Sequence, residues 1–127
     1  MRDTIFPTLE EALYLHDLLL VKFGGPEGVL DRGLLESALA RPRSGYYKSL
    51  SEQAAALLHS LALNHPFVDG NNRVAFALTA VFLKMNGFSL EVAAVEAKPF
   101  IEVDIIQRKL PVGEIARWLE SHMRHQR

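Results

Sequence analysis

Residues 65–73 read His-Pro-Phe-Val-Asp-Gly-Asn-Asn-Arg, and this polar stretch separates the two most apolar parts of the chain. Residues 52–64 before it are apolar nearly all round a helix, and residues 73–86 after it are apolar on most faces. A helix of that kind is buried on most sides. Pro66 ends the first helix, because a proline disfavours helical geometry in the residue before it. The sequence therefore predicts two buried helices joined by one polar loop.

The residues of this loop could together bind and transfer a phosphate group. The second helix begins here, and the free N–H groups and dipole at its N-terminus favour an anion. Gly70 would let the backbone approach a phosphate, Asn71 could add an amide donor, and Arg73 offers a planar fork of donors. Asp69 is a hard oxygen ligand that suits Mg²⁺, and His65 can accept a proton from a hydroxyl group near pH 7.

Each loop residue also has a purely structural explanation. His65 could end the first buried helix, and Asn71 or Asn72 could cap the second. Asp69 could form a turn with Gly70. Because all of these groups fall in one loop between two buried helices, their combination favours a phosphoryl or nucleotidyl transferase site.

The rest of the chain predicts further helices around this pair. Residues 8–11 have the Thr-x-x-Glu form of a capping box, and the apolar spacing that follows indicates a helix over about residues 9–23. Asp31 can cap a shorter helix that ends at Ala40, and Ser51 is expected to cap the first buried helix.

The sequence also gives predictions for five further segments. Residues 41–49 are typical of a loop, residues 89–96 fit a helix or a strand, and residues 99–109 have mixed periodicity. Residues 112–123 indicate an amphipathic helix, and residues 124–127 are expected to fray. We therefore expect an all-α fold, a compact helical bundle that forms a single domain over residues 1–127.

Composition excludes several classes of protein. The chain has 127 residues, of which 49% are hydrophobic and 23% charged, as in an ordinary globular domain. It has no cysteine, which excludes a disulfide framework, a thiolate metal site and a cysteine nucleophile. The formal net charge is −1, without the basic excess of a nucleic-acid-binding protein. No apolar run approaches the ~20 residues of a membrane span, and no signal peptide is recognisable. We expect a cytoplasmic protein without direct nucleic-acid or membrane binding.

The loop resembles the signature of the Fic/Doc family, His-x-Phe-x-Asp/Glu-Gly/Ala-Asn-x-Arg. Other stretches resemble the death-on-curing (Doc) branch of this family, namely residues 15–17, 23–25, 34–39, 41–43 and 115–119. The resemblance implies a Fic fold with the active loop between the two buried central helices. It also implies a transferase that acts on a hydroxyl side chain of another protein.

The resemblance implies a role for each residue of the motif. His65 would be the general base that activates the target hydroxyl, and Phe67 would anchor the loop in the core. Asp69 would bind Mg²⁺, Asn71 would build the anion hole, and Arg73 would hold nucleotide phosphates. The nucleotide-binding set would comprise Gly70, Asn71, Asn72 and Arg73.

Relatives also carry an extended flap upstream of the motif, which pairs its backbone with the target segment. By resemblance, this docking role would fall to residues 43–49, with Arg43, Tyr46 and Tyr47 as the contact residues.

Two departures from the family pattern bear on the chemistry. Many relatives that transfer AMP have glycine where this chain has Asn72, and a second arginine where it has Phe76. One kinase of the Doc branch, which acts on elongation factor Tu, has lysine at the first of these positions. Asn72 is bulkier than glycine, so it should narrow the α-phosphate cradle, and it does not replace the lysine charge. We therefore expect phosphoryl transfer from ATP, with Mg²⁺, to a translation factor such as elongation factor Tu, and AMP transfer (AMPylation) as the alternative.

The resemblance further implies a toxin of a toxin–antitoxin system. Self-restrained relatives carry a Ser/Thr-x-x-x-Glu-Gly/Asn segment whose glutamate pairs with the second arginine, and this chain has neither that segment nor that arginine. Restraint would then come from a Phd-like antitoxin. A catalytically inactive Fic-fold binding module stays open as an alternative, because Asn72 and Phe76 lie in or beside the motif.

A different enzyme class also fits one doublet. His16-Asp17, with His59 as a further ligand, could belong to a metal-dependent phosphohydrolase. Such enzymes need several His and Asp ligands from different helices, and this chain has few of them. A hydrogen-bonded core histidine is the preferred interpretation of His59.

Overall fold

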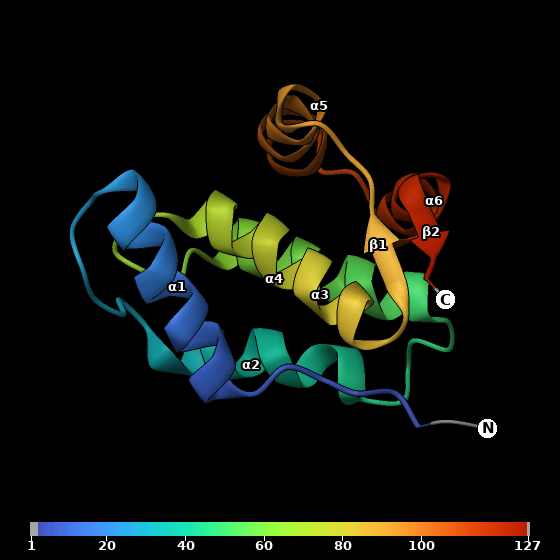
Figure 1. Ribbon diagram of the computed structural model, residues 1–127, viewed down its shortest axis with the longest axis horizontal. Helices are drawn as coiled ribbons and strands as arrows, with labels where there is room; N and C mark the ends of the chain where they lie inside the picture. Colours follow the sequence, from blue (N-terminus) through green and yellow to red (C-terminus); the bar gives the residue numbers. More distant parts are fainter. Residues whose placement is uncertain (1–2, 127) are drawn as a thin grey trace.

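The structure, a computed structural model, describes residues 3–126. Within these residues the chain forms six α-helices, two short helical turns of other types and a two-stranded sheet (Figure 1). In chain order they are α1 (Leu9–Phe23), α2 (Arg32–Ala40), the 3₁₀ turn η1 (Arg41–Arg43), α3 (Leu50–Asn64), α4 (Asn71–Met85), β1 (Phe88–Leu90), α5 (Ala94–Pro99), the π-helix η2 (Phe100–Gln107), α6 (Val112–His122) and β2 (Met123–His125). The predicted all-α fold class is confirmed, since the small sheet only joins the segment after α4 to the segment after α6.

Helices α3 and α4 form the centre of the molecule. They run antiparallel side by side, and α1, α2 and α6 pack around them (Figure 1). Leu57, Leu58 and Leu61 of α3 and Leu78 and Phe82 of α4 are all at most 1% exposed. The predicted pair of buried helices joined by a polar loop is therefore present, and the loop lies at one end of the bundle.

Side-chain caps begin α1, α2 and α3. The predicted capping box of α1 is confirmed: the Glu11 N–H donates to Thr8 Oγ1 over 3.1 Å, and the Thr8 N–H donates to Glu11 Oε1 over 2.9 Å. The prediction that Ser51 caps α3 is wrong. Ser49 caps it, in a second capping box with Glu52. Ser51 is buried inside the helix, where its hydroxyl group donates to a carboxylate of α6.

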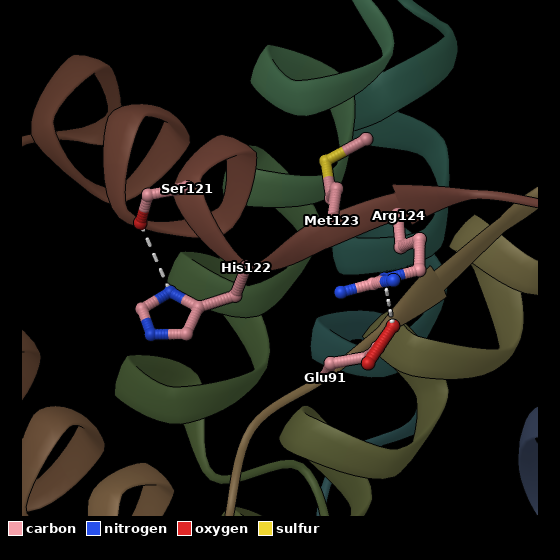
Figure 2. A pocket seen from close by; sticks show the side chains of 5 residues that line it. All are labelled: Glu91, Ser121, His122, Met123 and Arg124. Atoms are coloured by element: carbon pink, nitrogen blue, oxygen red, sulfur yellow. Dashed lines mark hydrogen bonds and ion pairs between the residues drawn. The ribbon is translucent and has the colours of Figure 1, made fainter.

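The C-terminal residues do not fray as predicted. β2 pairs with β1 in antiparallel register, with Phe88 opposite His125 and Leu90 opposite Met123. An ion pair between Arg124 Nε and Glu91 Oε2, 2.6 Å apart, adds to this closure, as Figure 2 shows beside a shallow polar hollow. The prediction for residue 127 lies outside the described residues. The ambiguous segment 89–96 thus contains the end of a strand and the start of a helix.

The segment of α5 and η2 stands beside the bundle as an arm (Figure 1). Its inner side is held by Ile101 and Ile105, which are buried, and by Phe100, which stacks on Trp118 of α6 at a centroid distance of 3.8 Å. Trp118 is partly buried and packs against the core. The mixed periodicity of residues 99–109 reflects the π-helical turn, in which apolar residues do not recur at the α-helical spacing.

No helix in the described part of the chain is long and apolar enough to cross a bilayer.

Candidate active site

The polar loop begins where α3 ends in a left-handed residue. His65 occupies the C-terminal cap of α3 with φ 48°, and its side chain is exposed. The next residue, Pro66, is buried, and its carbonyl oxygen accepts from the N–H groups of Leu30 (2.8 Å) and Asp31 (3.0 Å). The loop is therefore tied at its start to the segment that precedes α2.

Phe67 anchors the loop in the core, as the resemblance implies. Its side chain is 1% exposed, and its backbone forms an isolated antiparallel bridge with Val29. Next to the bridge, the Val68 N–H donates to the carbonyl oxygen of Gly28 over 3.1 Å. Residues 28–31 thus form a short extended segment along one edge of the loop.

His16 of α1 supports the loop from below. His16 is 2% exposed, and its ring stacks on the ring of Phe67 with a centroid distance of 3.9 Å and an interplanar angle of 11°. Its Nε2–H donates to the carbonyl oxygen of Asp69 over 2.9 Å. His16 is therefore a positioning residue for the backbone that carries Asp69.

The positions of His16, Asp17 and His59 argue against a metal-dependent phosphohydrolase. His16 uses its Nε2 on the loop, while Asp17 is exposed. His59 Nδ1 lies 3.0 Å from Arg41 Nη1 and accepts from it, so His59 is the hydrogen-bonded residue expected. Across residues 3–126, no three His, Cys, Asp or Glu side chains come close enough to share a metal ion.

Asn71 closes the loop with two hydrogen bonds to one residue. Its Oδ1 accepts from the Phe67 N–H, and its Nδ2 donates to the Phe67 carbonyl oxygen, both over 2.9 Å. The prediction that Asn71 or Asn72 caps α4 is therefore wrong: Gly70, with φ 77°, occupies the cap position, and Asn71 is the first helical residue. The side-chain amide of Asn71 is committed to this clamp, so its contribution to an anion hole would come from its backbone N–H.

The N-terminus of α4 offers donors to an anion. Val74 is the first residue of the helix whose N–H bonds back along it, to Gly70 over 3.0 Å. The N–H groups of Asn71, Asn72 and Arg73 therefore point out of the helix end, where the helix dipole favours negative charge.

These groups open into one pocket of about 750 Å³ between the loop, α1 and the α5–η2 arm. That volume lies in the range of small-molecule sites, roughly 300–1,000 Å³. The pocket is lined by Leu19, Lys22, Phe23, His65, Asp69, Gly70, Asn71, Asn72, Arg73, Phe76, Ala77, Ala97, Lys98, Ile101 and Glu102. All six residues predicted as catalytic, nucleotide-binding or metal-binding within the loop are thus brought together.

Charged groups surround the mouth of this pocket. Arg73 lies over the ring of Phe23 with 4.6 Å between its Cζ and the ring centroid, and Lys22 approaches the same ring at 5.3 Å. Asp69 is exposed and faces Gly25, whose missing side chain leaves room for the carboxylate. An exposed carboxylate beside a helix N-terminus fits Mg²⁺, which proteins commonly bind through one or two carboxylates and the phosphates of a substrate.

The predicted docking segment is in the wrong place. Arg43, Tyr46 and Tyr47 precede α3, whereas His65 follows it, and a helix of 15 residues separates its ends by about 20 Å. The two ends of α3 lie on opposite sides of the molecule (Figure 1). Tyr47 is instead tied to the bundle, because its hydroxyl group accepts from Arg41 Nε over 2.9 Å. The segment beside the loop is residues 28–31.

Sequence reasoning missed two parts of this site. The signal for His16 is its place on an apolar helix face, where a single histidine indicates a buried hydrogen bond. The wall formed by Ala97, Lys98, Ile101 and Glu102 had no recognisable signal, since its residues follow a break in helical periodicity.

Comparison with known proteins agrees with this geometry. The model of the Fic/DOC family matches residues 6–83. The chain belongs to the Fic/DOC family, which confirms the predicted family and its fold. A "Toxin Doc" from Mycolicibacterium smegmatis (strain ATCC 700084 / mc(2)155) is 48% identical over 75 residues, which cover 55% of this chain and 58% of that protein. A "Protein kinase doc" from Escherichia phage P1 is 35% identical over 82 residues, which cover 61% of this chain and 65% of that protein. The matched region thus spans less than two thirds of either relative.

Proposed function

We propose that this chain is a Doc-like toxin that transfers the γ-phosphoryl group of ATP to a hydroxyl side chain of another protein. The observation that carries the proposal is that His65, Asp69, Arg73 and the N-terminus of α4 line one pocket. This set provides a base, a carboxylate for Mg²⁺ and an anion cradle, which are the parts that phosphoryl transfer needs. The similarity to a protein named as a kinase supports the same reaction.

The residues would divide the work as follows. The target hydroxyl oxygen attacks the γ-phosphorus, the bond from that phosphorus to the bridging oxygen breaks, and ADP leaves. The imidazole of His65 takes the hydroxyl proton. Arg73 and the N–H groups of α4 hold the phosphate oxygens, and Asp69 would hold Mg²⁺, which neutralises phosphate charge when bound.

The target would dock along residues 28–31. The backbone groups of Gly28 and Leu30 face the loop, through bonds to Val68 and Pro66. In an extended segment, the backbone of the residue between them faces the other way, so Val29 presents an open edge. An extended target segment could add to that edge by backbone pairing. Leu30, which is 71% exposed, provides an apolar contact beside it.

AMP transfer is the second candidate, and one observation favours it. Asn72 was expected to narrow the α-phosphate cradle, but its Oδ1 is buried in the pocket wall and has no hydrogen-bond partner among the described residues. The oxygen therefore does not project into the cradle. An α-phosphate would therefore not meet this oxygen, although Asn72 still lines the pocket.

Labelled ATP separates the two reactions. The purified chain is incubated with cell lysate, Mg²⁺ and ATP that carries label at either the α- or the γ-phosphate, and purified elongation factor Tu serves as the first defined target. We expect γ label on a protein band. Transfer of α label would establish AMP transfer instead, and movement of neither label would refute transfer from ATP to the proteins supplied.

Two variants make this experiment specific. His65→Ala removes the base at an exposed position and should abolish labelling without a change in melting temperature. His125→Ala is the matched control, because it removes an exposed histidine on β2 that does not line the pocket. Full labelling by His65→Ala would exclude His65 as the base.

A toxin of this kind would be restrained in trans. We propose a Phd-like antitoxin as the partner and the cytoplasm, where translation factors act, as the place of action. Expression of the chain alone should arrest growth, and co-expression of a Phd-like protein encoded beside it should restore growth. Normal growth of cells that express the folded, unmodified chain would count against the toxin assignment.

A further inference from the structure

The wall of the pocket that faces the loop carries a lysine with no established role. Lys98 lies near the end of α5, is exposed, and lines the pocket together with Glu102 of η2. The ion pairs within residues 3–126 include neither of these two side chains. The ammonium group of Lys98 is therefore available to a ligand in the pocket.

The cations of this pocket are divided between its two sides. Lys22 and Arg73 both lie against the ring of Phe23, on the side formed by α1 and the start of α4. Further along α4, the residues that line the pocket are Phe76 and Ala77, which carry no charge. On the opposite side of the pocket, formed by α5 and η2, the positive charge comes from Lys98.

A polyphosphate chain matches this arrangement. Its charges are spread over several groups, and a second cation close to those that lie beyond the reach of Arg73 would stabilise them by charge-assisted contacts. The apolar residues of α4 cannot supply that cation.

We propose that Lys98 binds the phosphates of the nucleotide that lie farthest from the loop, those that leave with the product. The inference rests on the proposed function, since it assumes that a nucleoside polyphosphate occupies the pocket. Lys98 would hold the nucleotide across the pocket, while Arg73 and the α4 N-terminus hold the phosphate beside His65. Its effect would fall on nucleotide affinity and not on proton transfer.

Titration calorimetry tests this with Mg·ATP, Mg·ADP and adenosine. Loss of one charge-assisted contact to phosphate weakens binding by about tenfold or more. We expect Lys98→Met to weaken Mg·ATP and Mg·ADP by about that factor and to leave adenosine unchanged. Lys98→Arg should restore most of the affinity, because it keeps the charge. The loss should shrink at high salt, since the site is open to solvent.

Lys84→Met is the matched control. Lys84 is an exposed lysine in the last turn of α4 and does not line the pocket, so its loss should leave all three affinities unchanged. Melting temperatures of the three variants are compared with that of the unmodified chain, so that unfolding is not mistaken for weak binding.

The outcomes separate this inference from the proposed function. If the unmodified chain binds Mg·ATP and Lys98→Met binds it equally well, the role of Lys98 is refuted and the transferase stands. Equal weakening of adenosine by Lys98→Met would also refute it, because the lysine would then support the base or the sugar. If the unmodified chain binds no Mg·ATP, both proposals fail.

Discussion

Replacement of His16 by alanine should destabilise the protein and displace Asp69 at the same time. The His16 ring fills buried space under the loop, stacks on Phe67 and donates to the Asp69 carbonyl oxygen. Alanine removes the stack and the donor and leaves a cavity. Because the lost hydrogen bond holds the backbone of Asp69, we expect an effect on Mg²⁺-dependent nucleotide binding as well as on stability.

The size of the effect follows from these contacts. The lost hydrogen bond accounts for about 1 kcal/mol of the free energy of unfolding, the aromatic stack for another ~1 kcal/mol, and the cavity for at least as much. Their sum of about 3 kcal/mol is a large part of the ~5–15 kcal/mol that stabilise a typical domain. For a chain of 127 residues it lowers the melting temperature by roughly 10 °C.

Urea denaturation and titration with Mg·ATP measure the two effects separately. His16→Phe keeps a ring on Phe67 but has no donor, so it should lose less stability than His16→Ala and still bind nucleotide weakly. His125→Ala, at an exposed position of β2, controls for loss of a histidine. A free energy of unfolding within ~0.5 kcal/mol of the unmodified chain would refute the packing argument. A destabilised His16→Ala with unchanged Mg·ATP affinity would refute the positioning role.

Three further predictions concern the same bundle. Gly25→Ala should weaken Mg·ATP binding, because φ of 117° strains any side chain there and a β-carbon would collide with Asp69 Oδ2; unchanged affinity would mean that the carboxylate moves without loss. Asp69→Asn should weaken binding of ATP in Mg²⁺ but leave binding in EDTA unchanged, as calorimetry in the two buffers would show, and equal loss in both would remove Asp69 from the metal role. Burial and the neighbouring Arg41 lower the pKa of the His59 imidazole, so the folded protein favours the neutral ring. The neutral His59 therefore contributes its full stabilisation above the ordinary pKa of about 6.5. This stabilisation is lost as the pH falls from there through the lower pKa of the folded state. Urea midpoints at pH 7.5 and 5.5 would test this, and a His59→Gln variant with the same pH dependence would contradict it.

Local signals account for most of what the sequence could predict about the fold. The capping box at Thr8 and Glu11 spans four residues and needs no tertiary contact to form. The start of α3 carries the same local signal, because Ser49 and Glu52 form the second capping box, and the prediction of Ser51 overlooked it. The hydroxyl group of Ser51 instead donates to Glu120, which is 69 positions away in the chain. The pairing of β1 with β2 is non-local in the same way, so residues 124–126 carried no local sign of order.

The site divides along the same line. The loop residues are contiguous, so their chemistry can be read from the chain itself. His16 comes from α1, which packs against α4, and Lys98 comes from α5, which packs against η2. The sequence near these two residues does not show that they meet the loop or the pocket. The error in the docking segment could have been avoided from the sequence, because the length of the helix between Tyr47 and His65 already separates them by about 20 Å.

The boundary of the family match also has a consequence for inhibitors. The match ends at residue 83, so it includes the loop and most of α4 but not the wall formed by residues 97–102. A competitive compound that touches only the loop would meet groups that the family shares and should act on many relatives. A compound that also reaches Lys98 and Ile101 would meet side chains outside that shared region, and selectivity for this protein should come from there.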